Sequence, residues 1–236
     1  EKQHVHSVYE STAPYFNEVQ SKAWPKVRQF LLEQEPGSLI VDIGCGTGKY
    51  LSVNSEIYNL GCDYCKPLVE IAKNNKHEVM VCDNLNLPFR DQCFDTVISI
   101  GVIHHFSTKQ RRIQAIKEMA RILVPGGRIM LYVWAMEQKS RRFEKNKALL
   151  PRRPSETNQP ENKININHND ETISVGEEEN DHSDSKAFMR YYHVFREGEL
   201  SNLLETDVPE LQITSSCFDH GNWCLIAGLV PLSGEN

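Results

Sequence analysis

One stretch of the chain joins a short apolar strand pattern to a single acid and three glycines: Leu39–Ile43 with Asp42, then Gly44, Gly46 and Gly48. A strand followed by so many glycines leaves backbone N–H groups open to a ligand, because no side chains block the approach. The spacing disfavours two nucleotide motifs. A dinucleotide fingerprint needs glycine where Lys49 stands, and a phosphate-binding loop needs Ser or Thr where Tyr50 stands. The pattern therefore predicts a cradle for another kind of cofactor.

The next three apolar stretches of the chain end at residues that could also contact a ligand: Asp63, Asp83 with Asn84, and Ile100 with Gly101. The carboxyl ends of parallel strands meet at one edge of a sheet, so a single ligand there contacts all of these residues. The Asp63 carboxylate suits two neighbouring ribose hydroxyls, and Asp83 suits an adenine amino group. Taken singly, each acid is more typical of a helix cap or a turn, and the indication of a ligand site comes from their combination with the glycine turn.

Helix and strand patterns alternate along the chain, which predicts an α/β fold with parallel β-α-β units. The predicted helices cover residues 4–16, a segment from Trp24 to a stop at Pro36 with Val27, Phe30, Leu31 and Leu32 buried, a segment from about Lys49, and 67–74, 109–123 and 197–205. The predicted strands cover residues 39–43, 57–63, 78–82, 94–100, 128–134, 211–217 and 222–227, with a hairpin turn at 219–222.

The chain of 236 residues is long enough for one α/β domain, and its helix and strand pattern is interrupted once. Residues 139–185 lack core residues, so we expect a disordered insertion within a single domain formed by residues 1–138 and 186–236. The insertion begins with a basic run, and residues 154–185 hold nine of the 32 acidic residues against one basic residue, Lys163. The remainder has 25 basic and 23 acidic residues, and its balance of +2 permits an RNA partner.

Apolar runs and cysteine spacing indicate a protein of the cell interior. No apolar run has the length of a membrane span, and the first residues lack a signal-peptide pattern. Seven scattered cysteines fit reduced thiols rather than a disulfide framework. Cys62 and Cys65 have metal-ligand spacing but no second pair, so we expect no metal site. We expect a location in the cytoplasm, with the nucleus as a second compartment.

The pattern D-x-G-x-G-x-G after a strand resembles motif I of the class I S-adenosyl-L-methionine (SAM) methyltransferases. Three further segments are similar to the tRNA wobble-uridine carboxymethyl methyltransferases: His104–Phe106, Tyr132–Gln138 and Arg190–Leu200. Residues 5–9 and Trp24-Pro25 fit the same family, so the resemblance covers about residues 1–138 and 188–227.

The resemblance implies a Rossmann-like class I fold with a mostly parallel seven-stranded sheet and helices on both faces. It implies SAM as cofactor, tRNA as substrate, esterification of the carboxymethyl group on uridine 34, and a small zinc-binding activator protein as partner. It places Asp42, Gly44, Gly46, Gly48, Asp63, Asp83, Asn84, Ile100 and Gly101 around the cofactor. The resemblance also implies that the substrate is positioned by Arg190, Tyr191, His193 and His105.

Other interpretations of the same residues stay open. Tyr191 and Tyr192 are also typical of core aromatics, Arg190 of a surface ion pair, and His104 or His105 of a turn histidine. A small-molecule methyltransferase would use Tyr9, Ala13 and Phe16 as a lid over the cofactor. A third hypothesis is a binding or regulatory scaffold that keeps the fold and the cofactor without tRNA activity.

Overall fold

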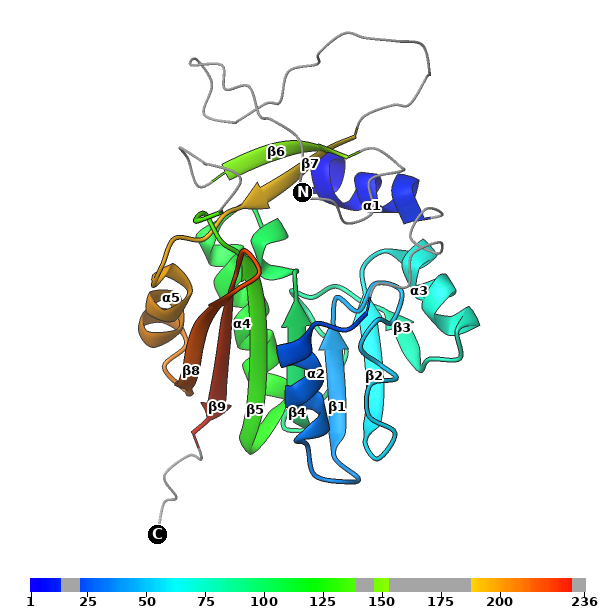
Figure 1. The fold of residues 1–236 in the computed structure, drawn as a ribbon, viewed down its shortest axis with the longest axis vertical. Helices are drawn as coiled ribbons and strands as arrows, with labels where there is room; N and C mark the ends of the chain where they lie inside the picture. Colours follow the sequence, from blue (N-terminus) through cyan, green and yellow to red (C-terminus); the bar gives the residue numbers. More distant parts are fainter. Residues whose placement is uncertain (14–21, 139–146, 153–187, 231–236) are drawn as a thin grey trace, which may run out of the picture.

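A twisted seven-stranded sheet lies at the centre of the computed structural model, which describes residues 1–13, 22–138, 147–152 and 188–230 (Figure 1). Its strand order is β3-β2-β1-β4-β5-β9-β8. The strands are β1 (Leu39–Ile43), β2 (Tyr58–Asp63), β3 (Val79–Val81), β4 (Phe94–Ile100), β5 (Leu123–Trp134), β8 (Leu211–Asp219) and β9 (Asn222–Leu229). Strands β1 to β5 pair in parallel, and β9 runs antiparallel to both β5 and β8. The prediction of a mostly parallel seven-stranded sheet is therefore confirmed.

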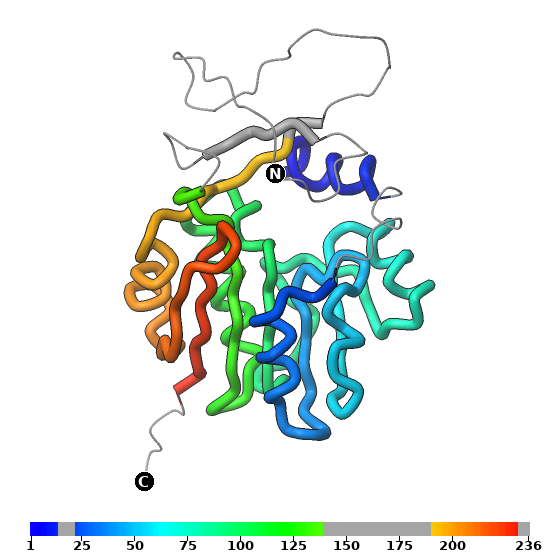
Figure 2. Tube along the Cα trace, in the orientation of Figure 1, coloured from blue at the N-terminus to red at the C-terminus, as the bar shows by residue number. Residues whose placement is uncertain are grey.

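Helices cover both faces of the sheet (Figures 1 and 2). They are α2 (Pro25–Leu32), α3 (Lys66–Asn74), α4 (Lys109–Ile122) and α5 (Glu199–Asp207). Because side chains alternate along a strand, Ile40 packs with α2 on one face, whereas Val41 and Ile43 pack with α4 and α5 on the other. These two apolar layers bury both faces of the sheet, so a ligand site is expected at the carboxyl ends of its strands.

A second, smaller layer lies above that carboxyl edge (Figure 1). It consists of the helical turn η1 (Lys2–His6), helix α1 (Ser7–Thr12), and a two-stranded antiparallel sheet of β6 (Lys147–Arg152) and β7 (Phe188–His193). The first residues of the sequence and the strand that follows the insertion thus contact each other over the same part of the sheet.

Most of the predicted elements are confirmed, and β4 has the predicted bounds. The helix predicted from Lys49 is wrong, because residues 49–53 form turns whose N–H groups donate to the third preceding carbonyl, as from Leu51 to Gly48 and from Val53 to Tyr50. Leu32 is 43% exposed and does not belong to the buried face of α2. Strand β5 begins at Leu123, five residues before the prediction, because Leu123 already pairs with Phe94.

The predicted insertion is only partly described. Residues 147–152 form strand β6, which corrects the expectation of disorder at those positions. The sequence could not show this strand because its partner, β7, follows only after residue 187. Residues 139–146 and 153–187 lie outside the described residues, and the domain boundaries stay a prediction. Within the described ranges, no helix combines the length and apolar composition that a membrane span requires.

Candidate functional site

A cavity of about 880 Å³ lies at the carboxyl ends of β1, β2 and β4, beneath η1 and α1. Every residue that the sequence assigned to the cofactor lines it: Asp42, Gly44, Gly46, Gly48, Asp63, Asp83, Asn84, Ile100 and Gly101. These residues come from separate segments of the chain, and the parallel sheet brings them together as predicted. His105 also lines the cavity, from the short 3-10 helix η3 (Ile103–His105) that follows β4.

The glycine turn presents its backbone to this cavity. The N–H groups of Gly44 and Cys45 both donate to the Cys62 carbonyl, which joins the end of β1 to β2. Gly44 has φ +84°, and a Cβ there would overlap the Val102 side chain. Gly46 has φ +54° and open space where a Cβ would stand. The turn therefore needs glycine for close packing at one position and leaves the cavity free at the next.

Substitution of Gly44 by Ala is expected to destabilise the protein by about 1–3 kcal/mol beyond the effect of backbone strain, because the new methyl group forces Val102 to move. Gly126→Ala is the matched control, since Gly126 has a similar φ of +80° and no atom near its missing Cβ. Urea unfolding of both variants measures the difference. Equal losses would contradict the packing argument, and a Val102→Ala partner substitution should restore most of the Gly44→Ala loss.

Asp63 fixes the shape of the glycine turn. Its Oδ2 accepts a hydrogen bond from the Gly46 N–H at 2.9 Å, and its Oδ1 accepts one from the Cys65 N–H at 2.8 Å. Burial raises the pKa of Asp63, although both hydrogen bonds oppose that shift. A carboxylate has about four lone-pair sites, so Asp63 keeps acceptor capacity for a ligand in the cavity.

Asp63→Ala should weaken SAM binding by roughly tenfold or more, since removal of a hydrogen-bonded charged acceptor costs about 1.5–3 kcal/mol. Asp63→Asn should lose less, because its amide oxygen still accepts from one backbone N–H of the turn. Isothermal titration calorimetry with both variants tests this, and Asp91→Ala, an exposed acid distant from the cavity lining, is the control. Unchanged SAM affinity in Asp63→Ala would remove this residue from the binding site.

Asp42 lies in the floor of the cavity, and both of its carboxylate oxygens are buried without a hydrogen-bond partner among the residues that the structure places. Burial, with a smaller contribution from the Asp63 charge, raises the pKa of Asp42 to about 8. A buried carboxylate without a partner is unfavourable unless a cation or a donor meets it. This orphaned group therefore fits a cofactor that carries positive charge, such as the sulfonium and ammonium groups of SAM.

Asp83 and Asn84 continue the same wall of the cavity. Asp83 is exposed, and its Oδ1 accepts from the N–H of Leu85 in a local turn, while Asn84 is buried and accepts from the Cys82 thiol. The hydrogen bond from Leu85 uses only Oδ1 of Asp83, so Oδ2 of Asp83 is left for a ligand. The turn interpretation and the ligand interpretation of Asp83 are thus compatible.

The roof of the cavity holds a directional chain of hydrogen bonds. Arg190 Nη1 donates to the Tyr9 hydroxyl oxygen at 3.0 Å, and the Tyr9 hydroxyl lies 3.0 Å from His105 Nε2. The other ring nitrogen of His105, Nδ1, lies 3.1 Å from the Tyr191 carbonyl oxygen. Because a carbonyl only accepts, His105 carries its proton on Nδ1, and Tyr9 donates to Nε2.

His105 is neutral in this arrangement. Burial, and then the neighbouring His104 and Arg190, hold the pKa of His105 well below its usual range. His104, whose Nδ1 accepts from the Trp134 N–H, has its pKa lowered to about 3 by burial and by the Arg190 charge. Both imidazoles are therefore uncharged at neutral pH, and Arg190 is the cation of this roof.

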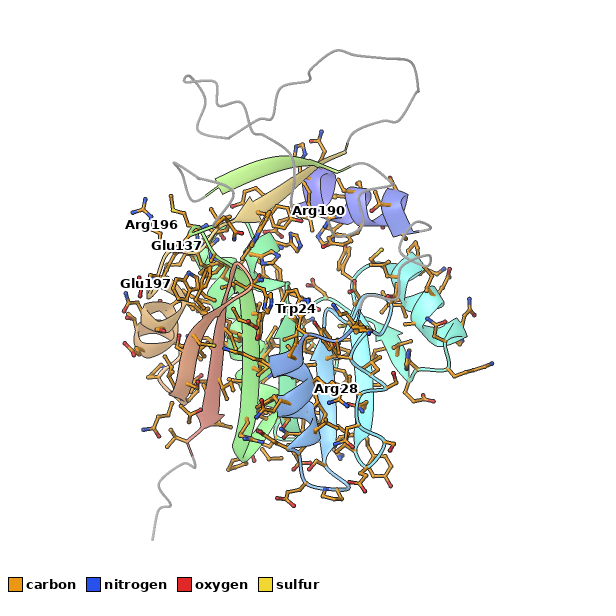
Figure 3. All side chains as sticks on the ribbon, in the orientation of Figure 1. Trp24, Arg28, Glu137, Arg190, Arg196 and Glu197 are labelled. Carbon is orange, nitrogen blue, oxygen red and sulfur yellow. The ribbon has the colours of Figure 1, made fainter. Side chains whose placement is uncertain are left out.

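Arg190 is a buried charge without a counter-ion among the described residues. Its side chain is 3% exposed, its Cζ lies 4.0 Å from the centre of the Tyr9 ring, and Nη1 also donates to the Tyr192 hydroxyl. Its Nε and Nη2 are buried and have no hydrogen-bond partner in the part of the chain that the structure describes. Burial of a guanidinium without an anion is costly, so the arrangement favours an anionic ligand beside Arg190. Figure 3 shows Arg190 on β7, beside α1.

The other two residues predicted to position substrate lie elsewhere. Tyr191 and His193 alternate with Arg190 along β7 and face away from Tyr9: the Tyr191 hydroxyl donates to the Ser107 carbonyl, and His193 pairs with Glu199. Neither residue lines the cavity, and Arg190 does not line it either, but the Arg190 side chain bonds to Tyr9, which does. The structure therefore brings the side chains of His105, Tyr9 and Arg190 together. It places the side chains of Tyr191 and His193 on the opposite face of β7, and only the Tyr191 carbonyl contacts His105.

Several residues of the site were not predicted. Tyr192 shares the strand face of Arg190, and its ring contacts those of His104, His105 and Trp134. Two-residue alternation along 188–193 was the signal that pairs Tyr192 with Arg190. Lys49 and Trp24 also line the cavity, with Lys49 Nζ 5.2 Å from the centre of the Trp24 ring, and burial lowers the pKa of Lys49. Nothing in the local sequence pattern indicates this pair.

The sequence of this chain is similar to those of known methyltransferases. Residues 41–131 match the family described as "Methyltransferase domain". The chain is 77% identical over 151 residues to "Probable tRNA methyltransferase 9B" of Homo sapiens, which covers 64% of this chain and 33% of that protein. It is 39% identical over 230 residues to the "tRNA (carboxymethyluridine(34)-5-O)-methyltransferase" of Schizosaccharomyces pombe, over 96% of both chains. The chain thus spans about a third of the human relative and nearly all of the yeast one.

A solved structure supports the same fold. The S-adenosylmethionine-dependent methyltransferase of Clostridium acetobutylicum superposes with a TM-score of 0.65 at 13% identity, over 94% of this chain and 99% of that one. At this identity the likeness concerns the fold alone. The Rossmann-like architecture expected from the sequence is thereby confirmed.

Proposed function

The chain belongs to the family of the tRNA (carboxymethyluridine(34)-5-O)-methyltransferases, and from this membership and the cavity we propose that it methylates the carboxymethyl group of wobble uridine 34 in tRNA with SAM. The observation that carries the proposal is Arg190, a buried guanidinium with two unpaired nitrogens and no counter-ion among the described residues. A carboxymethyl group supplies the carboxylate that this cation lacks.

The cavity suits SAM as the second ligand. Asp42 offers an unpartnered carboxylate to its positive groups, Asp63 and Asp83 keep free lone pairs for ribose and adenine, and the glycine turn leaves room for both. Lys49 offers a cation to the carboxylate of the methionine part. When bound, SAM supplies an activated methyl group to a nucleophile.

The proposed reaction needs positioning rather than proton transfer. A carboxylate with an ordinary pKa near 4 is ionised at neutral pH, so it attacks without a general base. This agrees with His105, which is neutral and uses both ring nitrogens in hydrogen bonds to Tyr9 and Tyr191. Arg190 would hold the carboxylate, and the aromatic roof of Tyr9 and Tyr192 would exclude water around it.

Substrate, partner and location are parts of the same proposal. The tRNA assignment rests on the family, and the mild basic balance outside residues 154–185 permits it. The zinc-binding activator protein expected from the family resemblance is proposed as a partner, and the cytoplasm, with the nucleus, as the location. Tyr191 and His193 keep proposed positioning roles only through neighbouring residues, because their side chains lie on the face of β7 opposite Arg190 and bond to Ser107 and Glu199.

The direct test is mass spectrometry of wobble nucleosides after incubation of the full chain, the activator and labelled SAM with tRNA that carries carboxymethyluridine. Formation of the methyl ester at uridine 34 is the expected result. Labelled SAM bound without any ester would favour the scaffold hypothesis instead. Ester formed on a free carboxylic acid but not on tRNA would favour the small-molecule hypothesis.

A further inference from the structure

Two cysteines face each other at the edge of the sheet, away from the cavity. Cys217 on β8 is the direct register partner of Cys224 on β9. Both pack with the apolar layer under α2, but Cys224 is buried, whereas Cys217 is half-buried on the outermost strand. The pair therefore combines a half-buried cysteine on the edge strand with a buried cysteine beside it on the next strand.

A lysine adjoins the more exposed sulfur. Lys26, in the first turn of α2, places Nζ 3.0 Å from Cys217 Sγ, and its own side chain is exposed. An ammonium at this distance stabilises a thiolate, which is the nucleophilic form of cysteine. Burial raises the pKa of the Cys224 thiol to about 12, so Cys224 stays protonated. The two sulfurs are thus chemically different although they face each other.

We propose that Cys217 and Cys224 form a peroxide-reactive dithiol in which Cys217 attacks, Cys224 resolves and Lys26 is the positioning residue. The Cys217 thiolate forms an S–O bond with hydrogen peroxide as the O–O bond breaks, and the departing hydroxide takes a proton and leaves as water. The Cys224 sulfur then forms an S–S bond with Cys217 as the S–O bond breaks, and that oxygen leaves as a second water with the Cys224 proton. Two thiols are oxidised and one peroxide is reduced.

The backbone already suits the product. Residues directly opposite in an antiparallel pair have Cα atoms about 4.5–5.5 Å apart, within the span of roughly 4.4–6.8 Å that disulfides adopt. The disulfide would cross-link the edge strand β8 to β9, and it would convert the thiol that Lys26 contacts into a neutral disulfide sulfur, which is a weaker acceptor for the ammonium. The first turn of α2 would then lose a link to β8.

The experiment treats the fully reduced chain with hydrogen peroxide and maps cross-linked peptides by mass spectrometry without reduction. Cys93 is the internal control: it is also half-buried, but its thiol donates to the Arg90 carbonyl. We expect a 217–224 disulfide with the loss of two hydrogens, formed at least tenfold faster than any oxidation of Cys93. Equal oxidation of Cys217 and Cys93, or a Cys217 product without Cys224, would overturn the proposal.

Two variants separate the roles of the residues. Cys224→Ser should stop at a sulfenic acid on Cys217, which dimedone traps. Lys26→Met should slow oxidation of Cys217 by about tenfold, because the variant loses the ammonium that contacts the attacking sulfur, and Lys26→Arg should restore most of the rate. An unchanged rate in Lys26→Met would exclude the positioning role. Circular dichroism confirms that each variant is folded, and methyl transfer is not needed as a readout.

Discussion

Replacement of Arg190 by Met is expected to lower methyl transfer by about a hundredfold or more, which corresponds to roughly 3 kcal/mol of positioning free energy. The same variant should unfold at an equal or higher temperature than the wild type. Arg190 is buried without a counter-ion among the described residues, so an apolar side chain of similar length removes an unfavourable charge from the free protein. SAM affinity should stay unchanged, because Arg190 does not line the cavity.

Arg196→Met is the matched control, since Arg196 follows on the same segment but is exposed and points to the outer surface (Figure 3). Single-turnover transfer, thermal unfolding and calorimetry with SAM give the three readouts. A structural role for Arg190 predicts the opposite pattern, with a lower melting temperature and weaker SAM binding in Arg190→Met. Equal rates of methyl transfer in Arg190→Met and Arg196→Met would show that Arg190 does not bind the substrate.

The stability of the free protein should fall as pH rises from about 4 to about 8, because of Asp42. Its pKa of about 8 lies far above its ordinary value of 3.8, so the folded state holds a proton that the unfolded state has lost over this window. The contribution is fully present below pH 3.8 and is lost as pH rises through 8, with a slope of up to about 1.4 kcal/mol per pH unit.

Binding of SAM should show the opposite sign. A cationic ligand prefers the ionised carboxylate, so SAM affinity should rise with pH by up to about tenfold per unit until Asp42 is ionised, near pH 8. Asp42→Asn cannot titrate and should flatten both the stability curve and the affinity curve. Urea unfolding and calorimetry at several pH values measure the differences between wild type and variant. Parallel curves for the two proteins would show that Asp42 does not titrate in this range.

The floor of the site was predictable from sequence because it depends on strand ends. Asp42, Asp63 and Asp83 each follow an apolar stretch, and parallel strands bring their carboxyl ends to one edge. The sequence could not show that Asp63 also binds the Gly46 N–H, because that bond depends on the shape of the turn. Nor could it show that Asp42 lacks a partner, which is a property of the packed interior.

The roof was harder to predict because it depends on long-range pairing. Arg190 and His193 are three residues apart, so on a strand they face opposite sides, whereas a helical spacing would bring them together. The sequence predicted residues 188–193 to be ordered but did not indicate a strand there. Without the alternation of a strand, Tyr191 and His193 were assigned to the same site as Arg190. Tyr9 meets Arg190 across 181 residues of chain, and no local pattern specifies such a contact.

The hydrogen bond between Arg190 and Tyr9 has a consequence for synthesis on the ribosome. Among the described residues, those that line the cavity lie between Glu1 and Phe106, so they are synthesised before the second half of this domain. Arg190 and β9, which completes the sheet beside β5, emerge much later. A nascent chain therefore carries the cofactor-facing surface before the Arg190 guanidinium is made, and the bond from Arg190 to Tyr9 forms only after β7 has been synthesised.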